Sequence, residues 1–403
     1  MKTTIASGIF ALLYASSASA EGLYFVGNEA QESLPLKWVV GASVIYDDNV
    51  NPGVGDKQSS VAINPYVGLS FVNITPQTTW DVYARLGLIY YFDQPVGGDN
   101  LNSQSRLGVN LTHRFSERLR FASRNFIAYE LEPDYSYGYA SARQSNEYFY
   151  WQTDNSIGFR WTERLATYTG FNITGANYDV PDNDRLTWEV YNQFRYQLTP
   201  NTVLTADYRY SQTEGNGQSS NSTDQYFLVG AEHRFSPNTI GIVRAGVQLR
   251  DVDDGADSTS PYLEFALNSQ VNEQFSVRSF VRYGMEYYET VVVHPTSGLS
   301  EFDDRRTLRV GVSGEYVLSP VVSLFSGIDY VPAQYQAGRQ LNAPYSSVSD
   351  LDENVINAFL GASFKFTDRL TGSVTYNYTH SDSDIAGRTY DRNRVSLGVS
   401  AEF

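Results

Sequence analysis

Arginine recurs in the polar half of several segments in which apolar and polar residues alternate. Arg278 and Arg282 are four residues apart, as are Arg305 and Arg309, and apolar residues of the opposite parity lie between them. A guanidinium group keeps its charge at any relevant pH and binds carboxylates through two parallel hydrogen bonds. Two kinds of chemistry are therefore open to these residues: ion pairs that brace a wall, or a positive ring that selects anionic solutes.

Other arginines occupy the same polar parity in their own segments. Acidic residues that share this parity and could pair with them are Asp207, Glu189, Glu286 and Glu315. For any single arginine the bracing pair is the favoured interpretation. As a set the arginines outnumber these acids, which predicts a mild anion preference. The predicted pore-lining residues are Arg85, Arg106, Arg114, Arg195, Arg209, Arg278, Arg282, Arg305, Arg309 and Arg394.

The last segment of the chain shows which element must position these side chains. Its apolar residues fall on one parity and its polar residues on the other, as expected for a half-apolar β-strand, where successive side chains point to opposite faces. A chain that ends on an aromatic residue of such a strand resembles the sorting signal of bacterial outer-membrane barrels. We predict that the barrel-assembly machinery reads this signal, which consists of Val399, Ala401 and Phe403.

The alternation continues through the whole chain and has two kinds of break. Short breaks contain Pro, Asn, Ser or Thr, which favour tight turns. They lie at 75–77, 116–118, 162–164, 199–201, 236–238, 272–274, 319–321 and 367–369. Long polar breaks lie at 47–59, 93–102, 132–145, 178–184, 213–223, 251–260, 289–304, 332–352 and 381–390. Eight short and nine long breaks delimit eighteen strands, with 16 and 20 as alternatives.

Short turns alternating with long loops are typical of the two ends of an outer-membrane barrel. A sheet in hydrocarbon must close on itself, because no water satisfies its edge groups. The 31 Tyr and 22 Phe fit aromatic girdles at the membrane interfaces. A soluble sandwich turns every 8–12 residues, more often than this chain does. The predicted fold is all-β: a transmembrane, antiparallel, up-and-down β-barrel with short periplasmic turns and long extracellular loops.

The N-terminus has the composition of a secretory signal peptide. Lys2 is followed by an apolar run too short to cross about 30 Å of hydrocarbon and then by small residues that end at Ala20. We predict cleavage after Ala20. The predicted domains are a signal peptide at 1–20, a periplasmic leader at 21–36 and a transmembrane barrel at 37–403. Cysteine is absent, and the net charge of −16 argues against nucleic acid as a partner.

The first alternating segment ends in GASVIYDDN, residues 41–49. Here the chain resembles the putative β-barrel porin type 2 family of bacterial proteins. The first strand of that family often reads glycine-x-serine followed by tyrosine-aspartate-aspartate-asparagine. The resemblance implies an outer-membrane barrel, and it brings no catalytic residues to this sequence.

Few residues suggest chemistry other than transport. Asp251, Asp253 and Asp257 around Gly255 are weak candidates for a calcium site, since no bidentate Glu follows at the expected spacing. Solvated loop acids are the favoured interpretation. The four histidines have no metal-ligand spacing, and no nucleophile and base can be assigned. We therefore predict no enzyme activity, no cofactor and no firm metal site.

The sequence thus predicts an outer-membrane channel for passive diffusion of small hydrophilic solutes, which contacts membrane lipids. Two alternatives are an exporter of extracellular polysaccharide and a structural or adhesive barrel plugged by residues 332–352 or by the leader. The Tyr-rich loop at 134–139 could narrow the pore or remain ordinary loop packing. The sequence leaves open whether copies of the chain form a homotrimer.

Overall fold

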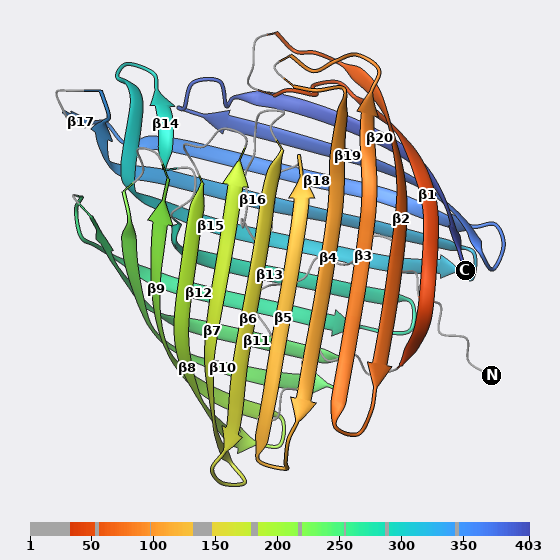
Figure 1. The fold of residues 1–403 in the computed structure, drawn as a ribbon, viewed down its shortest axis with the longest axis vertical. Coiled ribbons are helices and arrows are strands. Elements are labelled where there is room, and N and C mark those ends of the chain that lie inside the picture. Colours follow the sequence, from red (N-terminus) through yellow and green to blue (C-terminus); the bar gives the residue numbers. More distant parts are fainter. Residues whose placement is uncertain are drawn as a thin grey trace.

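Antiparallel strands form one sheet that closes into a barrel (Figure 1). The computed structural model describes residues 33–52, 56–96, 98–131, 147–178, 184–216, 220–253, 255–286, 290–342 and 346–403. Within these residues, no helix has the length and hydropathy needed to cross a membrane. The strands are β1 (Leu34–Asp47), β2 (Ser60–Ile74), β3 (Thr78–Tyr91), β4 (Leu101–Arg114), β5 (Leu119–Glu130), β6 (Tyr148–Arg160), β7 (Leu165–Tyr178), β8 (Arg185–Thr199), β9 (Thr202–Gly215), β10 (Ser222–Ser236), β11 (Thr239–Val252), β12 (Ser258–Gln270), β13 (Phe275–Glu286), β14 (Val291–His294), β15 (Gly298–Ser319), β16 (Val322–Gln340), β17 (Ser347–Val348), β18 (Leu351–Lys365), β19 (Leu370–Ser383) and β20 (Tyr390–Glu402).

Eighteen of these strands make up the barrel wall. β14 pairs only with the outer part of β15, and β17 pairs only with the outer part of β16. Between them, β13 pairs directly with β15, and β16 pairs directly with β18. The barrel closes where β1 runs antiparallel to β20, from Val39 opposite Glu402 to Asp47 opposite Arg394. The predicted fold class and strand number are confirmed.

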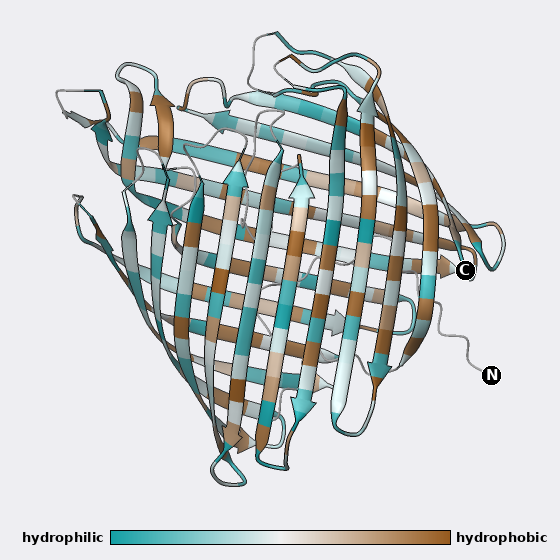
Figure 2. Ribbon diagram, in the orientation of Figure 1, coloured by the Kyte–Doolittle hydropathy of each residue, from teal (hydrophilic) through white to brown (hydrophobic). Residues whose placement is uncertain are grey.

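Each strand has an apolar outer face and a mostly polar inner face. On β3, Leu86 is 62% exposed on the outer surface, whereas Tyr83, of the opposite parity, is 5% exposed. Figure 2 shows hydrophobic and hydrophilic residues alternating along the strands. Hydrocarbon favours the apolar parity on the outside, because a charge facing lipid at the midplane costs about 2–4 kcal/mol for Arg or Lys. The polar parity therefore lines the lumen.

The short breaks are tight turns at one end of the barrel, as predicted. Residues 75–77 join β2 to β3, and residues 320–321 join β15 to β16. We call this the short-turn end. The first residue of β1 and the last residue of β20 both lie there. The long loops lie at the opposite end, which we call the long-loop end. The first strand begins at Leu34, three residues before the predicted start, because Leu34 already pairs with Val72 of β2.

Two predicted loops are largely strand. In the predicted loop 289–304, β14 and the first part of β15 form a hairpin. In the predicted loop 332–352, β16 continues to Gln340, where it still pairs with Ser300 of β15. The loop was predicted to begin at Pro332. The β15–β16 register is the same on both sides of this proline, with Thr307 opposite Ala333 and Val310 opposite Tyr330, so the strand continues through it and only the pairing beside it is lost. Residues 332–340 therefore belong to the wall and do not form a plug.

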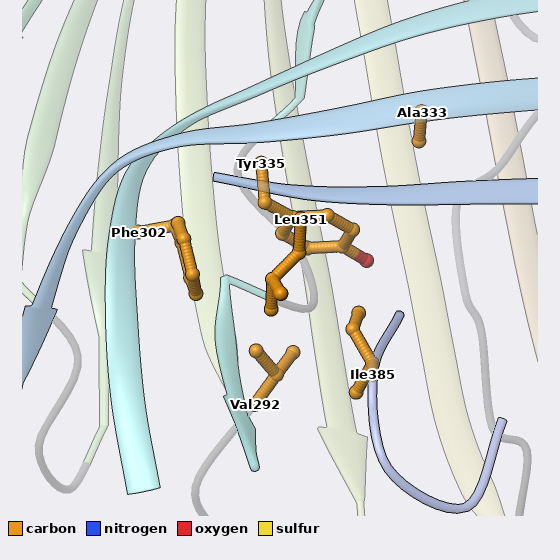
Figure 3. Close-up of a cluster of buried hydrophobic side chains, with 6 residues drawn as sticks. All are labelled: Val292, Phe302, Ala333, Tyr335, Leu351 and Ile385. Atoms are coloured by element: carbon orange, nitrogen blue, oxygen red, sulfur yellow. The ribbon is translucent and has the colours of Figure 1, made fainter. Parts of the chain in front are cut away.

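Buried apolar side chains join the outer ends of these strands (Figure 3). Phe302 of β15 and Tyr335 of β16 meet edge to face, with 5.6 Å between ring centroids. Leu351 of β18 and Ile385, which follows β19, pack into the same cluster. This packing fixes the position of Tyr335, whose hydroxyl contacts the charged residues described below. The remaining members of the cluster are Val292 and Ala333.

The hairpin of β14 and β15 also contacts neighbouring loops. The Asp303 carboxylate accepts a hydrogen bond from the Ala256 N–H at 2.9 Å, in the β11–β12 loop. The Glu301 carboxylate accepts from the Ser220 N–H at 2.5 Å, in the β9–β10 loop. His294 lies 3.1 Å from the Ser349 hydroxyl. These bonds hold the hairpin against three loops at the long-loop end.

Candidate pore lining

One group on the inner faces of β8 to β12 contains three arginines and three carboxylates. Arg195 is fully buried and binds Glu232 through both guanidinium Nη atoms, with 2.8 Å from Nη1 to Oε1. Such a fork-to-fork pair satisfies both carboxylate oxygens. We call this group the balanced cluster. Its members are Arg195, Asp207, Arg209, Glu232, Arg244 and Glu264.

Arg244 connects the members of the balanced cluster. Its Nη1 atom lies 3.1 Å from the Glu264 carboxylate, directly opposite in the β11–β12 register. Its Nη2 atom lies 3.5 Å from the Glu232 carboxylate. Arg209 approaches Glu264 at 3.7 Å. Because Arg244, Glu232 and Glu264 are almost fully buried, this part of the wall is a closed network with little charge facing water.

The next group along the wall holds more arginine than carboxylate. Glu286 of β13 is bound by Arg282 at 2.7 Å, by Arg305 at 2.9 Å and by Arg309 at 2.9 Å. Strand register explains the convergence: Glu286 lies opposite Arg305, and Arg282 lies opposite Arg309. Three guanidinium groups thus share the single carboxylate of Glu286.

A second carboxylate continues this group toward the long-loop end. Glu353 of β18 is 3.9 Å from Arg305 and 3.7 Å from Arg388. The Tyr335 hydroxyl accepts hydrogen bonds from Arg305 at 2.9 Å and Arg388 at 3.2 Å, and donates to Glu353 at 3.3 Å. We call this the surplus cluster, since four arginines share two carboxylates. Its members are Arg282, Glu286, Arg305, Arg309, Glu353 and Arg388.

The surplus cluster adjoins the balanced cluster, because Arg282 lies opposite Glu264 across the β12–β13 pair. Two of its members still reach water: the side chains of Arg282 and Arg388 are 26% and 15% exposed. A positive surplus with low-dielectric walls raises the local concentration of anions. This stretch of the lumen is therefore suited to attract an anionic solute.

A further ion pair closes the barrel seam. Arg392 of β20 contacts both Asp47 carboxylate oxygens from its Nε atom, at 3.1 and 3.0 Å. Arg394, directly opposite Asp47 in register, approaches it at 3.5 Å. At the short-turn end of the same seam, the backbone N–H and C=O of Phe403 pair with those of Trp38. The seam thus joins the first strand to the last at both ends.

The tyrosine-aspartate-aspartate-asparagine sequence supplies much of the seam. Asp48 accepts hydrogen bonds from the Asn393 backbone N–H at 2.7 Å and from Lys57 at 2.8 Å. Burial alone would raise the pKa of Asp48, but the hydrogen bonds from Asn393 and Lys57 outweigh it and lower this pKa. Asn49 donates to the Asp391 carbonyl at 3.0 Å. The motif therefore binds β1 and its following loop to β20.

The other predicted arginines occupy varied positions. Arg85 lies 3.9 Å from the centre of the Tyr66 ring and donates to Asn64 at 3.3 Å. Arg106 of β4 pairs with Glu130 of β5. Both are on the inner face, and both have structural partners.

Arg114 and Arg278 differ from these paired arginines in exposure. Arg114 is the exposed last residue of β4, beside the turn at the short-turn end, so it lies at the rim of the pore. Arg278 is exposed on the inner face of β13. It lies opposite Ser313, which is two residues from Glu315 on β15.

Several arginines of the inner wall were absent from the predicted set. Arg244 and Arg250 share the polar parity of β11, so the same alternation rule would have found them. Arg250 binds Asp224 at 2.9 Å. Arg339 and Arg388 were taken as loop residues. Their pairs with Glu301 and Glu353 depend on how the outer strands extend, which the sequence pattern does not reveal.

The weak metal candidates lie at the end of β11 and in the loop that follows it. Among the residues that the structure describes, no group of three or more His, Asp or Glu side chains could hold a metal ion, and Asp251, Asp253 and Asp257 are all described. The Tyr-rich loop 134–139, the predicted signal peptide and the predicted leader as far as residue 32 lie outside the described residues.

The family model of the putative beta-barrel porin 2 proteins matches residues 156–403. The chain belongs to this family. The resemblance read from the first strand is thereby confirmed by a match that begins in β6. The protein is an outer-membrane β-barrel of the porin class, which contacts membrane lipids and small solutes. Its long-loop end corresponds to the extracellular side and its short-turn end to the periplasmic side.

Solved structures of outer-membrane barrels are also similar to the chain. Pseudomonas aeruginosa OpdK with vanillate has 11% identity and a TM-score of 0.45, and the match covers 91% of this chain and 98% of that one. P. aeruginosa OccK2 (OpdF) in complex with glucuronate has 9% identity and a TM-score of 0.45, covering 93% and 99%. Acinetobacter baumannii OccAB3 has 10% identity and a TM-score of 0.45, covering 91% and 99%. No curated protein matches the chain.

Proposed function

We propose that this porin passes small hydrophilic solutes by passive diffusion and prefers anions. The surplus cluster carries the proposal, because four arginines share two carboxylates on the inner wall. Pores lined by arginine favour anions for the same reason that rings of acidic residues favour cations. The acidic balance of the whole chain does not oppose this preference, since selectivity is set by charges that face the lumen.

The balanced cluster explains why the preference is expected to be mild. Its three arginines are matched by three carboxylates, and Arg195 and Arg244 are almost fully buried, so these two add little field to the lumen. Selectivity then depends on a few partly exposed guanidinium groups, chiefly Arg282 and Arg388 in the surplus cluster and Arg278 nearby.

Liposome swelling tests the proposal with solutes of matched size. Purified protein is reconstituted, and entry of glucose, gluconate and glucosamine is compared. We expect all three to enter, with gluconate fastest and glucosamine slowest at low salt. Failure of all three to enter would contradict the channel. Fastest entry of glucosamine would contradict the anion preference alone.

We also propose how the protein reaches the membrane. Residues 1–20 are a signal peptide cleaved after Ala20, residues 21–33 are a periplasmic leader in place of the predicted 21–36, and the barrel begins with β1 at Leu34 in place of residue 37. The barrel-assembly machinery recognises the outward parity of β20, which ends at Phe403. The intact mass of the mature protein tests the cleavage site, since a mature N-terminus other than Glu21 would exclude it.

Copies of the chain are proposed to associate side by side in the membrane. The homotrimer considered from the sequence is one such arrangement. A surface that packs against another protein in the membrane can carry polar side chains that hydrogen-bond across the contact, whereas a surface that faces lipid is apolar. The polarity of the outer surface therefore bears on this proposal.

A further inference from the structure

The outer surface has a polar area on four adjacent strands, β5 to β8. Its side chains share the parity of exposed apolar residues such as Ile127 and Phe171, so they point outward. We call this the outer polar patch. Its members are Ser123, Asn125, Thr153, Asn155, Thr169 and Asn192.

The patch lies within the apolar band and not at its edge. On β5 the outward residues Phe121 and Ile127 flank it on either side, and on β6 Trp151 and Ile157 do the same. The strands pair in register across it, with Asn125 opposite Thr153. The patch is therefore near the middle of the hydrocarbon layer.

Hydrogen bonds link the members in two groups, one on β5 and β6 and the other on β7 and β8. The Thr153 hydroxyl donates to the side-chain oxygen of Asn125 at 2.8 Å, and the side-chain amide of Asn155 donates to the Thr153 hydroxyl at 2.9 Å. The Asn192 amide donates to Thr169 at 2.7 Å. Each carboxamide has two N–H donors and an acceptor oxygen, so these bonds use part of its capacity. Hydrocarbon satisfies none of the remainder, which makes lipid a costly neighbour here.

The described strands elsewhere on the outer surface lack such a feature. Other outward carboxamides of the described strands, such as Asn177, Gln225 and Asn354, lie near strand ends, where water or headgroups reach them. On β20, at the middle of the band, the outward residues are Val395, Leu397 and Val399. One side of the barrel is thus set apart from the others.

We propose that the outer polar patch is the surface on which a second copy of this chain docks in the membrane. This inference rests on the outer-membrane placement of the barrel. All copies share one orientation and one depth, so the patch of one barrel meets the patch of another at the same level. Its groups are uncharged and include both donors and acceptors, so two patches complement each other.

The symmetry follows from the number of patches. A single self-complementary surface forms a two-fold pair, in which the same residues meet on both copies. A three-fold ring needs two different complementary faces, and the described strands show one polar face at this depth. The structure therefore favours a dimer over the homotrimer.

Cross-linking tests the contact directly, because the chain has no native cysteine. Asn155→Cys places one thiol in the patch, and Leu397→Cys places one in the apolar band of β20 as a control. In outer membranes treated with a short bis-maleimide, which alkylates two thiols, we expect covalent dimers from Asn155→Cys and monomers from Leu397→Cys. Monomers from both variants, or equal dimer yields, would overturn the proposal.

A second experiment removes the polar groups. We expect wild-type protein in nanodiscs to be a dimer, and the triple variant Asn125→Leu, Asn155→Leu, Asn192→Leu to be a monomer. Heat-modifiable gel mobility and single-channel conductance verify that the variant is folded and open. A monomeric or trimeric wild type, or a dimeric triple variant, would contradict the proposal. Loss of conductance in the wild type would instead contradict the channel function.

Discussion

The balanced and surplus clusters use the same residue types to different effect. In the balanced cluster Arg195 is fully buried against Glu232, and each of the three arginines has a carboxylate within 4 Å. In the surplus cluster Glu286 alone receives three arginines, and the Arg282 side chain is 26% exposed. The difference shows that an arginine on the inner face can brace the wall or attract a solute. Which of the two it does depends on how many carboxylates lie near it and on how exposed its side chain is.

The two clusters should also differ in how they respond to mutation. Removing one partner of a buried ion pair leaves an uncompensated charge, which costs more than the pair itself contributes. Removing one arginine of three from a shared carboxylate leaves no unpaired charge. Stability should therefore depend on the balanced cluster, and selectivity on the surplus cluster.

The largest effect is expected in the balanced cluster. Glu232→Gln leaves Arg195 without its bidentate partner and weakens the position of Arg244. We expect a loss of about 3–5 kcal/mol in the free energy of unfolding, measured by urea titration of heat-modifiable mobility. Glu315→Gln, at a partly exposed carboxylate of β15, serves as the control and should change stability little. Equal losses in the two variants would contradict a bracing role for Glu232.

The next effect tests which residues of β15 face outward and which face the lumen. Val312 is 45% exposed on the outer face of β15, and Ser313 follows it on the inner face. Val312→Arg should cost about 2–4 kcal/mol near the midplane, whereas Ser313→Arg should be tolerated and should increase anion preference. Folded yield in lipid vesicles measures the first effect. Equal yields for both variants would show that the inner and outer faces are wrongly assigned.

A smaller effect on stability separates the surplus cluster from the balanced one. Arg282→Gln leaves Glu286 bound by Arg305 and Arg309, so the free energy of unfolding should change by about 1 kcal/mol or less. The anion preference should nevertheless fall, because a partly exposed positive charge is lost. Reversal potentials of the variant and the wild type provide the measurement. An unchanged reversal potential would place selectivity elsewhere in the lumen.

The smallest effect requires no mutation. The Debye length falls from about 30 Å at 0.01 M salt to about 3 Å at 1 M. Anion preference that arises from partly exposed arginines should weaken over this range, while the buried balanced cluster keeps the fold stable. Urea unfolding and ion selectivity, each measured at both salt concentrations, check this pair of outcomes. Selectivity that does not vary with salt would point to pore size in place of charge.

Period-two alternation predicted much of this structure. It identified eighteen strands, the inward parity of Arg282, Arg305 and Arg309, and the outward parity that ends at Phe403. These features follow from the alternation of side chains across a strand, which is a local property of the sequence. The tyrosine-aspartate-aspartate-asparagine motif was recognised, but its role at the seam was not. Asp47 meets Arg392 only when the first and last strands pair.

Features that depend on distant segments could not be read from the sequence. The convergence of three arginines on Glu286 requires the β13–β15 register, which in turn requires the β14 hairpin to extend beyond the barrel wall. The outward position of Asn125 and Asn155 follows from alternation, but their adjacency depends on strand pairing. The local sequence pattern therefore predicted which residues lie on each face of the barrel. Which of these residues lie side by side could be known only from the pairing of the strands.

Single-channel recording of the wild-type protein in a planar bilayer tests the central claim most directly. The claim is that an open barrel owes a mild anion preference to the surplus cluster. In a low-salt potassium chloride gradient, we predict stepwise conductance with a reversal potential shifted toward that of chloride. A reversal potential shifted toward that of potassium would contradict the role of the arginines, and absence of conductance steps would contradict the open channel.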